Sequence, residues 1–315
     1  MPHPLRPDSV AAARPLDLAA AAVMVGLCVS WGGNQVAVKL ALPDIPPLIQ
    51  GVVRSAAAAL IVLAWVRRRG VRLSARDGTL RSGTAAGLLF ALEFILLYRG
   101  LLLTTASRAA LLLYTAPLFV ALGAFWLLPA ERFGTVQWLG LMLAFGGIAT
   151  ALGVPQSIGG ASTLFGDLLI IAAAVAWGAT TLVIKATALA RAPFEKTLLY
   201  QLVVSAPLMG IAAAVFGEHP SATPSAVALG ALVYQTVWVV SITYLVWFAL
   251  ITRYSASRLA AFTFLTPVFG VAAGHLMLGE PLTPSLLLAL ALVAGGLVLV
   301  NKPASGWPRR QPRWG

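Results

Sequence analysis

Ten apolar runs, each about as long as a lipid bilayer is thick, follow one another along this 315-residue chain. A helix needs roughly 20 apolar residues to cross the hydrocarbon core of a bilayer. The runs lie near residues 17–40, 47–66, 83–102, 106–128, 135–153, 164–187, 196–216, 226–250, 257–278 and 284–301. Helices and closed barrels are the structures that satisfy every backbone hydrogen bond in lipid, and the runs lack the alternating pattern of barrel strands. They therefore predict an all-α integral membrane protein with about ten transmembrane helices.

The composition leaves too few charged residues to cover a surface that faces water. Hydrophobic residues make up 59% of the chain, charged residues 10%, and the mean hydropathy is +0.89. A soluble domain carries about 25% charged residues. Cys28 is the single cysteine, which excludes an intrachain disulfide and a cysteine-based metal site. We therefore expect the lipid bilayer as a partner, no cofactor and no bound metal.

The net charge of +12 would suggest a nucleic-acid partner in a soluble protein, but here it predicts an orientation. If the N-terminus is cytoplasmic, all but four of the 22 Lys and Arg residues fall in cytoplasmic segments. The exceptions are Lys39, Arg54, Arg99 and Arg108. Because basic residues collect in cytoplasmic loops, this distribution predicts a multi-pass protein of the cell (inner) membrane with both termini cytoplasmic. The first run is too long for a signal peptide, so we expect it to be retained.

The two halves of the chain repeat each other. WGGNQVAVK at 31–39 resembles WGATTLVIK at 177–185, and ASRAALLLYTAP at 106–117 resembles ASRLAAFTFLTP at 256–267. Glu131 and Gly146-Gly147 correspond in the same order to Glu280 and Gly295-Gly296. Five spans is an odd number, so the second half enters the membrane from the opposite side, as in many alternating-access carriers. The sequence thus predicts two inverted five-helix repeats.

The predicted organisation has four segments. A cytoplasmic tail covers residues 1–16, the first repeat 17–155, the second repeat 156–301 and a basic cytoplasmic tail 302–315.

These motifs resemble the EamA-type members of the drug/metabolite transporter superfamily. The resemblance lies in the paired five-span halves, in TAP and LTP of each fourth span, and in PAERFGTVQWLGLMLAFGGI and LGEPLTPSLLLALALVAGGLVL. It covers nearly the whole chain, from about Met24 to Asn301, with Ala130 in place of the usual Gly before Glu131. The resemblance implies a carrier, often an exporter, of amino acids or other small metabolites. It does not identify the substrate.

The sequence therefore predicts a secondary transporter that exports amino acids or related small metabolites by alternating access, as a monomer or weak dimer. One alternative is a multi-span membrane enzyme, but the chain has neither G-x-S-x-G nor H-E-x-x-H. We therefore expect no enzymatic activity. A membrane channel is the other alternative, against which the internal repeat argues. A Walker A pattern is also absent, so direct use of ATP is not expected.

Two ionisable residues fall near the middle of predicted spans. Glu93 is in the third span and Arg54 in the second. A charge at this depth is costly in lipid and usually faces a partner or a cavity. Glu93 is therefore a candidate for proton coupling or amine binding, and a structural pair between Glu93 and Arg54 is the equally weighted alternative.

Aromatic and polar residues give a second set of candidates for substrate binding. In the carriers that this chain resembles, spans one, three, four, six, eight and nine line a central cavity. The candidates on these spans, besides Glu93, are Trp31, Asn34, Tyr114, Trp177, Thr181, Tyr244 and Trp247. Aromatic rings with polar tips suit an amphipathic substrate such as an amino acid. For any single aromatic residue, helix packing or a place at the membrane interface is the usual alternative.

Prolines and basic residues complete the candidates. Pro117 and Pro267 interrupt matched spans and free the carbonyls of Leu113 and Thr263, a feature of transporter sites and also of simple packing kinks. Lys39, Lys185 and His275 are further candidates for coupling or gating, besides Glu93 and Arg54. The usual alternative is snorkelling to the interface for the two Lys residues and helix packing for His275. The Gly-Gly pairs predict close helix contacts.

Overall fold

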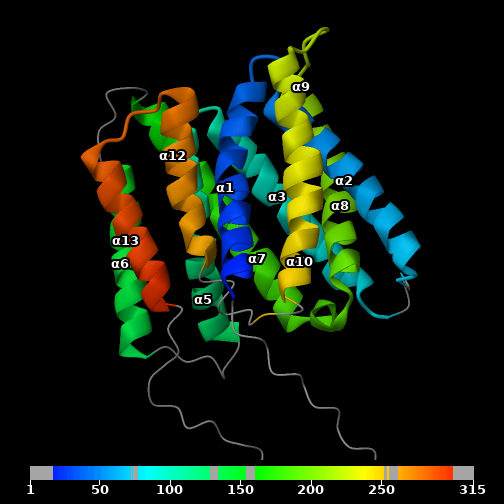
Figure 1. The fold of residues 1–315 in the computed structure, drawn as a ribbon, viewed down its shortest axis with the longest axis horizontal. Helices are drawn as coiled ribbons and strands as arrows, with labels where there is room; N and C mark the ends of the chain where they lie inside the picture. The colour runs from blue at the N-terminus through cyan, green and yellow to red at the C-terminus, as the bar shows by residue number, and fades with distance from the viewer. Residues whose placement is uncertain are drawn as a thin grey trace, which may run out of the picture.

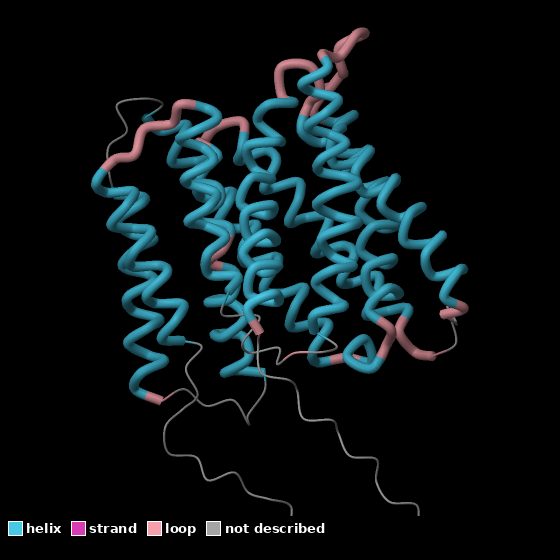
Figure 2. Tube along the Cα trace, viewed as in Figure 1, coloured by secondary structure: helices cyan, strands magenta, loops and turns pink. Residues whose placement is uncertain are grey.

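Over the residues that the computed structural model describes, each predicted span coincides with a helix or with consecutive helical segments. The structure describes residues 17–71, 73, 77–127, 134–153, 160–251, 254 and 262–300. The predictions for both tails lie outside the described residues, as do Glu131 and the first part of the second repeated motif, residues 256–261. Within the described ranges every regular element is helical, and the connecting loops are short (Figure 2). The prediction of an all-α protein is therefore confirmed.

The helices of the first half keep close to the predicted bounds. They are α1 (Leu18–Ala41), α2 (Pro47–Arg69), α3 (Leu80–Leu101), α4 (Ala106–Leu113), α5 (Ala116–Leu127) and α6 (Thr135–Gly153). The second half contains α7 (Gly160–Ala186), η1 (Ala188–Arg191), α8 (Phe194–Val215), α9 (Ala226–Val233), η2 (Tyr234–Thr243), α10 (Tyr244–Ile251), η3 (Thr263–Leu265), α12 (Thr266–Leu278) and α13 (Pro284–Val300).

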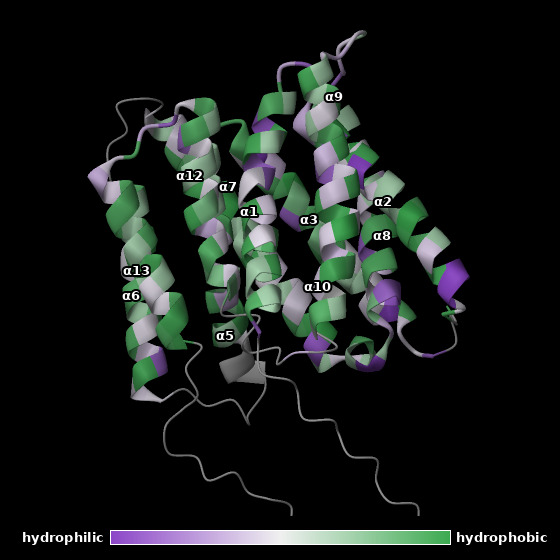
Figure 3. Cartoon of the chain, in the orientation of Figure 1, coloured by the Kyte–Doolittle hydropathy of each residue, from purple (hydrophilic) through white to green (hydrophobic). Residues whose placement is uncertain are grey.

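The described helices are long and apolar enough to cross a membrane. Eight stretches meet both criteria, and two shorter apolar stretches, Thr263–Leu278 and Pro284–Val300, bring the total to about ten. Their surfaces are largely hydrophobic, and hydrophilic residues gather toward helix ends, as at the end of α2 (Figure 3). Many large apolar side chains, such as Leu276 and Ile211, are exposed on the outside of the bundle. Such a surface is stable against lipid and not against water.

The helices pack in the pattern that a two-fold relation between the halves requires. Helix α1 packs against α12, and α7 packs correspondingly against α4 and α5. Helix α3 packs against α7, as α1 does against α9 and η2. Helix α2 pairs with α8, and α6 pairs with α13 at one edge of the bundle (Figure 1). Exchanging the two halves turns each of these contacts into itself or into another contact of the bundle. The inverted orientation of the two repeats stays a prediction.

Three predicted spans are interrupted helices. The fourth span breaks at Tyr114 and Thr115, between α4 and α5, and Pro117 lies in the first turn after the break. In the described part of the ninth span the 3₁₀ helix η3 leads into α12, and Pro267 lies in the first turn of α12. The eighth span passes through η2, a ten-residue π-helix. Proline is tolerated in a first turn, where its missing N–H has no helical acceptor, and π-helical turns often mark functional sites.

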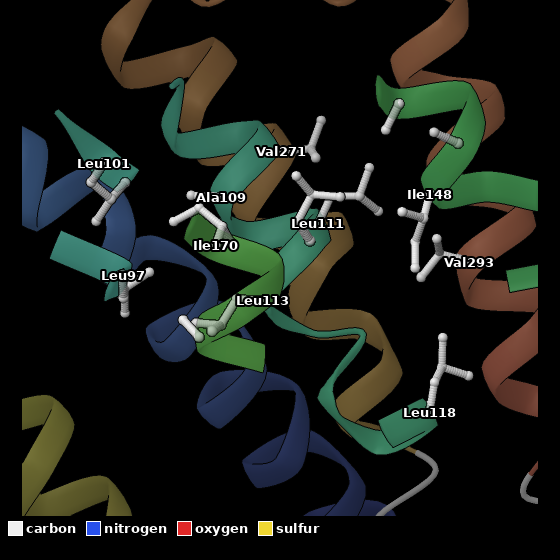
Figure 4. Close-up of a cluster of buried hydrophobic side chains, with 14 of the residues drawn as sticks. Leu97, Leu101, Ala109, Leu111, Leu113, Leu118, Ile148, Ile170, Val271 and Val293 are labelled. Atoms are coloured by element: carbon white, nitrogen blue, oxygen red, sulfur yellow. The ribbon is translucent and has the colours of Figure 1, made fainter. Parts of the chain in front are cut away.

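The apolar core lies between α3, α4, α6, α7, α12 and α13. Leu97, Leu111, Ile170 and Val293 are buried there and belong to one cluster (Figure 4). The four come from α3, α4, α7 and α13, so residues far apart in the chain meet in this cluster.

Glycines allow the closest contact between α6 and α13. A Cβ atom added at Gly296 would lie 2.6 Å from the Gly140 carbonyl oxygen, and one at Gly147 would lie 2.9 Å from the Ala289 carbonyl oxygen. Gly146 has nothing within 4 Å of such an atom, and Gly295 has only a leucine methyl group at 3.4 Å. One glycine of each predicted Gly-Gly pair therefore permits the close approach, and the other does not contribute.

Candidate functional site

Arg54 is buried in the interior of the bundle without a charged partner in contact. It lies on α2, and its side chain is 4% exposed. The guanidinium carbon lies 4.1 Å from the centre of the Phe94 ring on α3, in a cation–π contact. Its Nε has no hydrogen-bond partner. Within the described part of the chain, Arg54 forms no ion pair. The guanidinium thus packs on the face of the Phe94 ring, and its N–H groups remain free to donate hydrogen bonds.

Glu93 lies on the adjacent helix α3 and is also buried, with 5% of its surface exposed. Its charge interacts with that of Arg54. Among the described residues, however, its carboxylate accepts no hydrogen bond and forms no ion pair. The structure therefore places Arg54 and Glu93 within electrostatic range of each other without the direct contact that a structural pair would make. Two buried charges in this state are costly unless something else compensates them.

Three tyrosine hydroxyl groups lie within electrostatic range of one or both of these charges. The charges of Arg54 and Glu93 both act on Tyr98 of α3 and Tyr244 of α10. Glu93 also acts on Tyr114, at the break between α4 and α5. The buried hydroxyl of Tyr98 has no hydrogen-bond partner. Helices α2, α3, α4 and α10, from both halves, therefore bring their polar side chains together in one cluster, which we call the Arg54–Glu93 cluster.

Thr266 brings α12 to the edge of the cluster. Its hydroxyl lies near Tyr114 and the Cys28 thiol, but it is buried with no partner in hydrogen-bond geometry. The Cys28 thiol instead donates to the Phe262 carbonyl oxygen at 3.1 Å.

The predicted aromatic residues form two edge-to-face pairs. Tyr114 and Trp177 have ring centres 5.5 Å apart, and Trp31 and Trp247 have ring centres 5.6 Å apart. The Trp31 indole also donates to the Thr243 hydroxyl at 2.8 Å. All four side chains are only half-buried, so they keep surface that a small molecule can contact.

The two polar candidates, Thr181 and Asn34, differ in their hydrogen bonding. Thr181 turns its hydroxyl onto the Trp177 carbonyl of its own helix, at 3.1 Å. Asn34 is buried on α1, and its Oδ1 has no partner. The Thr181 hydroxyl is therefore hydrogen-bonded within its own helix, whereas the Asn34 Oδ1 is free to accept a hydrogen bond.

Lys39 and Lys185, which correspond in the two repeats, have different surroundings. Lys39 is half-buried and donates to the Thr104 carbonyl oxygen at 2.5 Å, so it connects α1 with the α3–α4 loop. Lys185 is exposed at the end of α7, with no ion pair or hydrogen bond among the described residues. His275 is exposed on α12 and bonds the Glu280 carbonyl oxygen through Nδ1 at 2.8 Å. His275 thus lies on the bundle surface.

Glu280 connects the halves at the bundle end that contains the α1–α2 and α3–α4 loops. Its carboxylate accepts the backbone N–H groups of Ala106 and Ser107 at 2.7 and 2.8 Å, and the Ser107 hydroxyl at 2.5 Å. These two N–H groups belong to the first turn of α4 and have no acceptor within the helix. A Cβ atom at Gly274 would lie 2.3 Å from the Ser107 hydroxyl oxygen, so a side chain there would displace the cap. We call this contact the Glu280 cap.

The same end holds an ion pair that sequence analysis missed. Arg108 of α4 donates through Nε and Nη2 to the carboxylate of Asp167 on α7. Asp167 also accepts from the Thr104 hydroxyl at 2.6 Å, and Arg108 Nη2 donates to the Ala151 carbonyl oxygen at 2.6 Å. Both charged residues are buried. A lone Asp inside an apolar run is itself a signal of a buried polar site, and it could have identified Asp167.

Carboxylates outside the spans have pKa values that follow from their contacts. Lys196 lies 2.5 Å from Asp77 and, with the Thr79 hydroxyl, lowers the pKa of Asp77 to about 2. Hydrogen bonds from the side chain and backbone of Ser225 lower the pKa of Asp44. Burial raises the pKa of Glu218, although that carboxylate accepts the N–H groups that begin α2. Asp44 and Glu218 each connect a loop of one half with a helix start of the other.

A groove of about 530 Å³ runs between α1, α9 and α12. Its lining is apolar apart from Tyr234, whose hydroxyl donates to the Ser30 carbonyl oxygen. It contains no charged side chain, so it differs chemically from the Arg54–Glu93 cluster.

A bundle of about ten apolar helices around buried, uncompensated charges defines a multi-pass membrane protein of the transporter class. The chain belongs to the EamA-like transporter family, whose sequence pattern matches residues 18–153 and again residues 164–302. It is 29% identical to the uncharacterized transporter YvbV of Bacillus subtilis, over 89% of this chain and 91% of that protein. It is 28% identical to a probable amino-acid metabolite efflux pump of Salmonella typhimurium, over 86% and 91%.

A solved structure shows the same fold. The chain of that crystal structure superposes with a TM-score of 0.63, covering 90% of this chain and 96% of its own length at 21% sequence identity. This likeness concerns the arrangement of the helices alone.

Proposed function

We propose that this protein is a secondary transporter that exports amino acids or related small metabolites across the inner membrane by alternating access. The observation that carries the proposal is the Arg54–Glu93 cluster in a member of a transporter family. Buried charges in a membrane protein mark substrate or ion pathways, because lipid offers them no compensation. The efflux-pump name of the Salmonella relative supports the substrate class and the direction.

Alternating access is supported by the difference between the two ends of the repeat. Lys39 is anchored and the Glu280 cap is formed at one end, while the counterpart Lys185 is exposed at the other. Inverted repeats that differ in this way can exchange their conformations, which moves access from one face to the other. The charge distribution assigns the capped end to the outside and both termini to the cytoplasm. The functional unit is a monomer or weak dimer that binds a small molecule from the cytoplasm.

A transport assay in proteoliposomes tests this proposal. Purified protein is given a pooled panel of amino acids, nucleosides, sugars and amphipathic drugs, and each compound is followed by mass spectrometry with and without a proton gradient. A carrier shows saturable movement and counter-exchange of one class. Movement that does not saturate and shows no exchange would replace the carrier with the channel alternative. Chemical conversion of a panel member would instead support an enzyme.

A further inference from the structure

The Arg54–Glu93 cluster has the charges of a receptor for a zwitterion. We infer that Arg54 binds the carboxylate and Glu93 the ammonium group of an α-amino acid, which makes the two residues opposite poles of one substrate site. The inference rests on the proposed transport function, and it specifies that the transported substrate is a zwitterion.

The first argument is the state of the two charges in the structure. Both side chains are more than nine-tenths buried, they interact electrostatically, and neither has an ion pair or a hydrogen bond among the described residues. Phe94 contacts the guanidinium from one side. A structural salt bridge would satisfy both groups directly, and a buried pair persists only with good geometry and satisfied hydrogen bonds. The missing contact leaves donors on Arg54 and acceptors on Glu93 available to a ligand.

The second argument is the sign of the charges. A simple anion would be attracted by Arg54 and repelled by Glu93, and a simple cation would meet the reverse. A zwitterion places one charge against each pole and stays neutral overall, so both residues gain a charge-assisted hydrogen bond. The unpartnered hydroxyl of Tyr98 lies within electrostatic range of both poles and adds a neutral hydrogen-bonding group.

The third argument is what surrounds the cluster. Tyr114 is linked electrostatically to Glu93 and Tyr244, and its ring contacts Trp177. These half-buried rings give the side chain of an amino acid an apolar surface beside its charged groups. Thr266, with its unpartnered hydroxyl near Tyr114, offers a further polar contact.

Competition with matched analogues tests the inference on the unaltered protein. Uptake of L-phenylalanine, or of another proteinogenic amino acid that the panel identifies, is measured in proteoliposomes in the presence of a competitor. One competitor is the corresponding amine, which lacks the carboxylate. The other is the corresponding carboxylic acid, which lacks the ammonium group. We expect each analogue to compete about 10- to 100-fold more weakly than the amino acid, because each loses one charge-assisted hydrogen bond in a buried site. If the amine competes as well as the amino acid, the carboxylate-binding role of Arg54 is wrong. If the carboxylic acid competes as well, the ammonium-binding role of Glu93 is wrong.

Variants assign each pole to its residue. Arg54→Gln should lower the apparent affinity for the amino acid about 10- to 100-fold and leave the affinity for the amine analogue unchanged. Glu93→Gln should lower the apparent affinity for the amino acid by the same factor and leave the affinity for the carboxylic acid unchanged. Arg99→Gln is the matched control, since Arg99 is partly exposed at the end of α3, 3.9 Å from Glu218. A Glu93→Gln protein that still exchanges the amino acid but no longer responds to a proton gradient would assign Glu93 to proton coupling and overturn its ammonium role.

The outcomes separate the inference from the proposed function. If no compound of the whole panel moves through protein shown to be folded, the transporter proposal itself fails. If sugars, nucleosides or drugs move with saturation and amino acids do not, the transporter stands and the zwitterion site is wrong.

Discussion

Arg108 and Asp167 form a bidentate ion pair inside the bundle, between α4 and α7. Arg108 Nε lies 3.2 and 3.0 Å from the two carboxylate oxygens of Asp167, and Nη2 donates to one of them as well. The Thr104 hydroxyl and the Ala151 carbonyl oxygen complete the hydrogen bonding. Unlike Arg54 and Glu93, these charges are fully compensated, so their role is to connect the two halves.

Asp167→Asn should destabilise the protein strongly. Removing one partner of a buried ion pair leaves the other charge uncompensated, which costs about 3–5 kcal/mol of the free energy of unfolding. Denaturant unfolding in detergent measures the change. The double variant Arg108→Met with Asp167→Leu removes both charges and should recover most of the loss. Equal destabilisation by the single and double variants would contradict this account of the pair.

Glu280→Gln should loosen the start of α4. The Glu280 cap satisfies two first-turn N–H groups, and losing a cap costs about 0.5–2 kcal/mol. Hydrogen exchange of the amides of Ala106 and Ser107 should therefore accelerate about 2- to 30-fold. Gly274→Ala should have the same effect, because its Cβ would collide with the Ser107 hydroxyl. Leu276→Ala, at a position of α12 that is 80% exposed, is the control. Unchanged exchange in Glu280→Gln would argue against the cap.

Gly296→Ala and Gly146→Ala should differ although both lie in the matched Gly-Gly motifs. The new methyl group at Gly296 would meet the Gly140 carbonyl oxygen at 2.6 Å, while that at Gly146 has nothing within 4 Å. Overpacking of this kind costs about 1–3 kcal/mol. The thermal midpoint of the purified protein should fall for Gly296→Ala and stay constant or rise for Gly146→Ala. Similar midpoints for the two variants would mean that α6 and α13 adjust to the added methyl group.

Lys39→Gln and Lys185→Gln test the asymmetry between the two ends. Lys39 donates a charge-assisted hydrogen bond to the Thr104 carbonyl oxygen, and such bonds contribute about 1.5–3 kcal/mol. Lys185 is exposed without a described partner, so its replacement should leave unfolding unchanged within about 0.5 kcal/mol. Denaturant unfolding of both variants measures the difference. A larger loss for Lys185→Gln would contradict the asymmetry.

Acid should weaken the connection between Asp77 and Lys196. Because the pKa of Asp77 is about 2 in the folded protein and 3.8 is its ordinary value, the unfolded chain binds the proton more tightly. This contribution to stability is present above pH 3.8 and is lost as the pH falls toward 2. Asp77→Asn should therefore reduce the slope of stability against pH in this window. An unchanged slope would mean that the ion pair does not persist in solution.

Much of the fold could be predicted because lipid restricts the choices of the chain. The run at 47–66 and helix α2 (Pro47–Arg69) begin at the same residue, since a span must satisfy its backbone internally wherever it is apolar. The break near Pro117 also follows from local chemistry, because proline lacks an N–H group. The ten-residue π-helix η2 has no such local signal in YQTVWVVSIT. It depends on the helices that pack around it.

Hydropathy and the cost of a charge in lipid act residue by residue, so the amino-acid sequence is enough to predict the class, the number of spans and the residues whose charges lie within them. Glu93 and Arg54 were identifiable in this way. Which charges meet could be seen only in the packed helices, because a contact depends on the rotation and depth of two helices from distant parts of the chain. The packing pairs Arg108 with Asp167, and it leaves Arg54 and Glu93 near each other without contact.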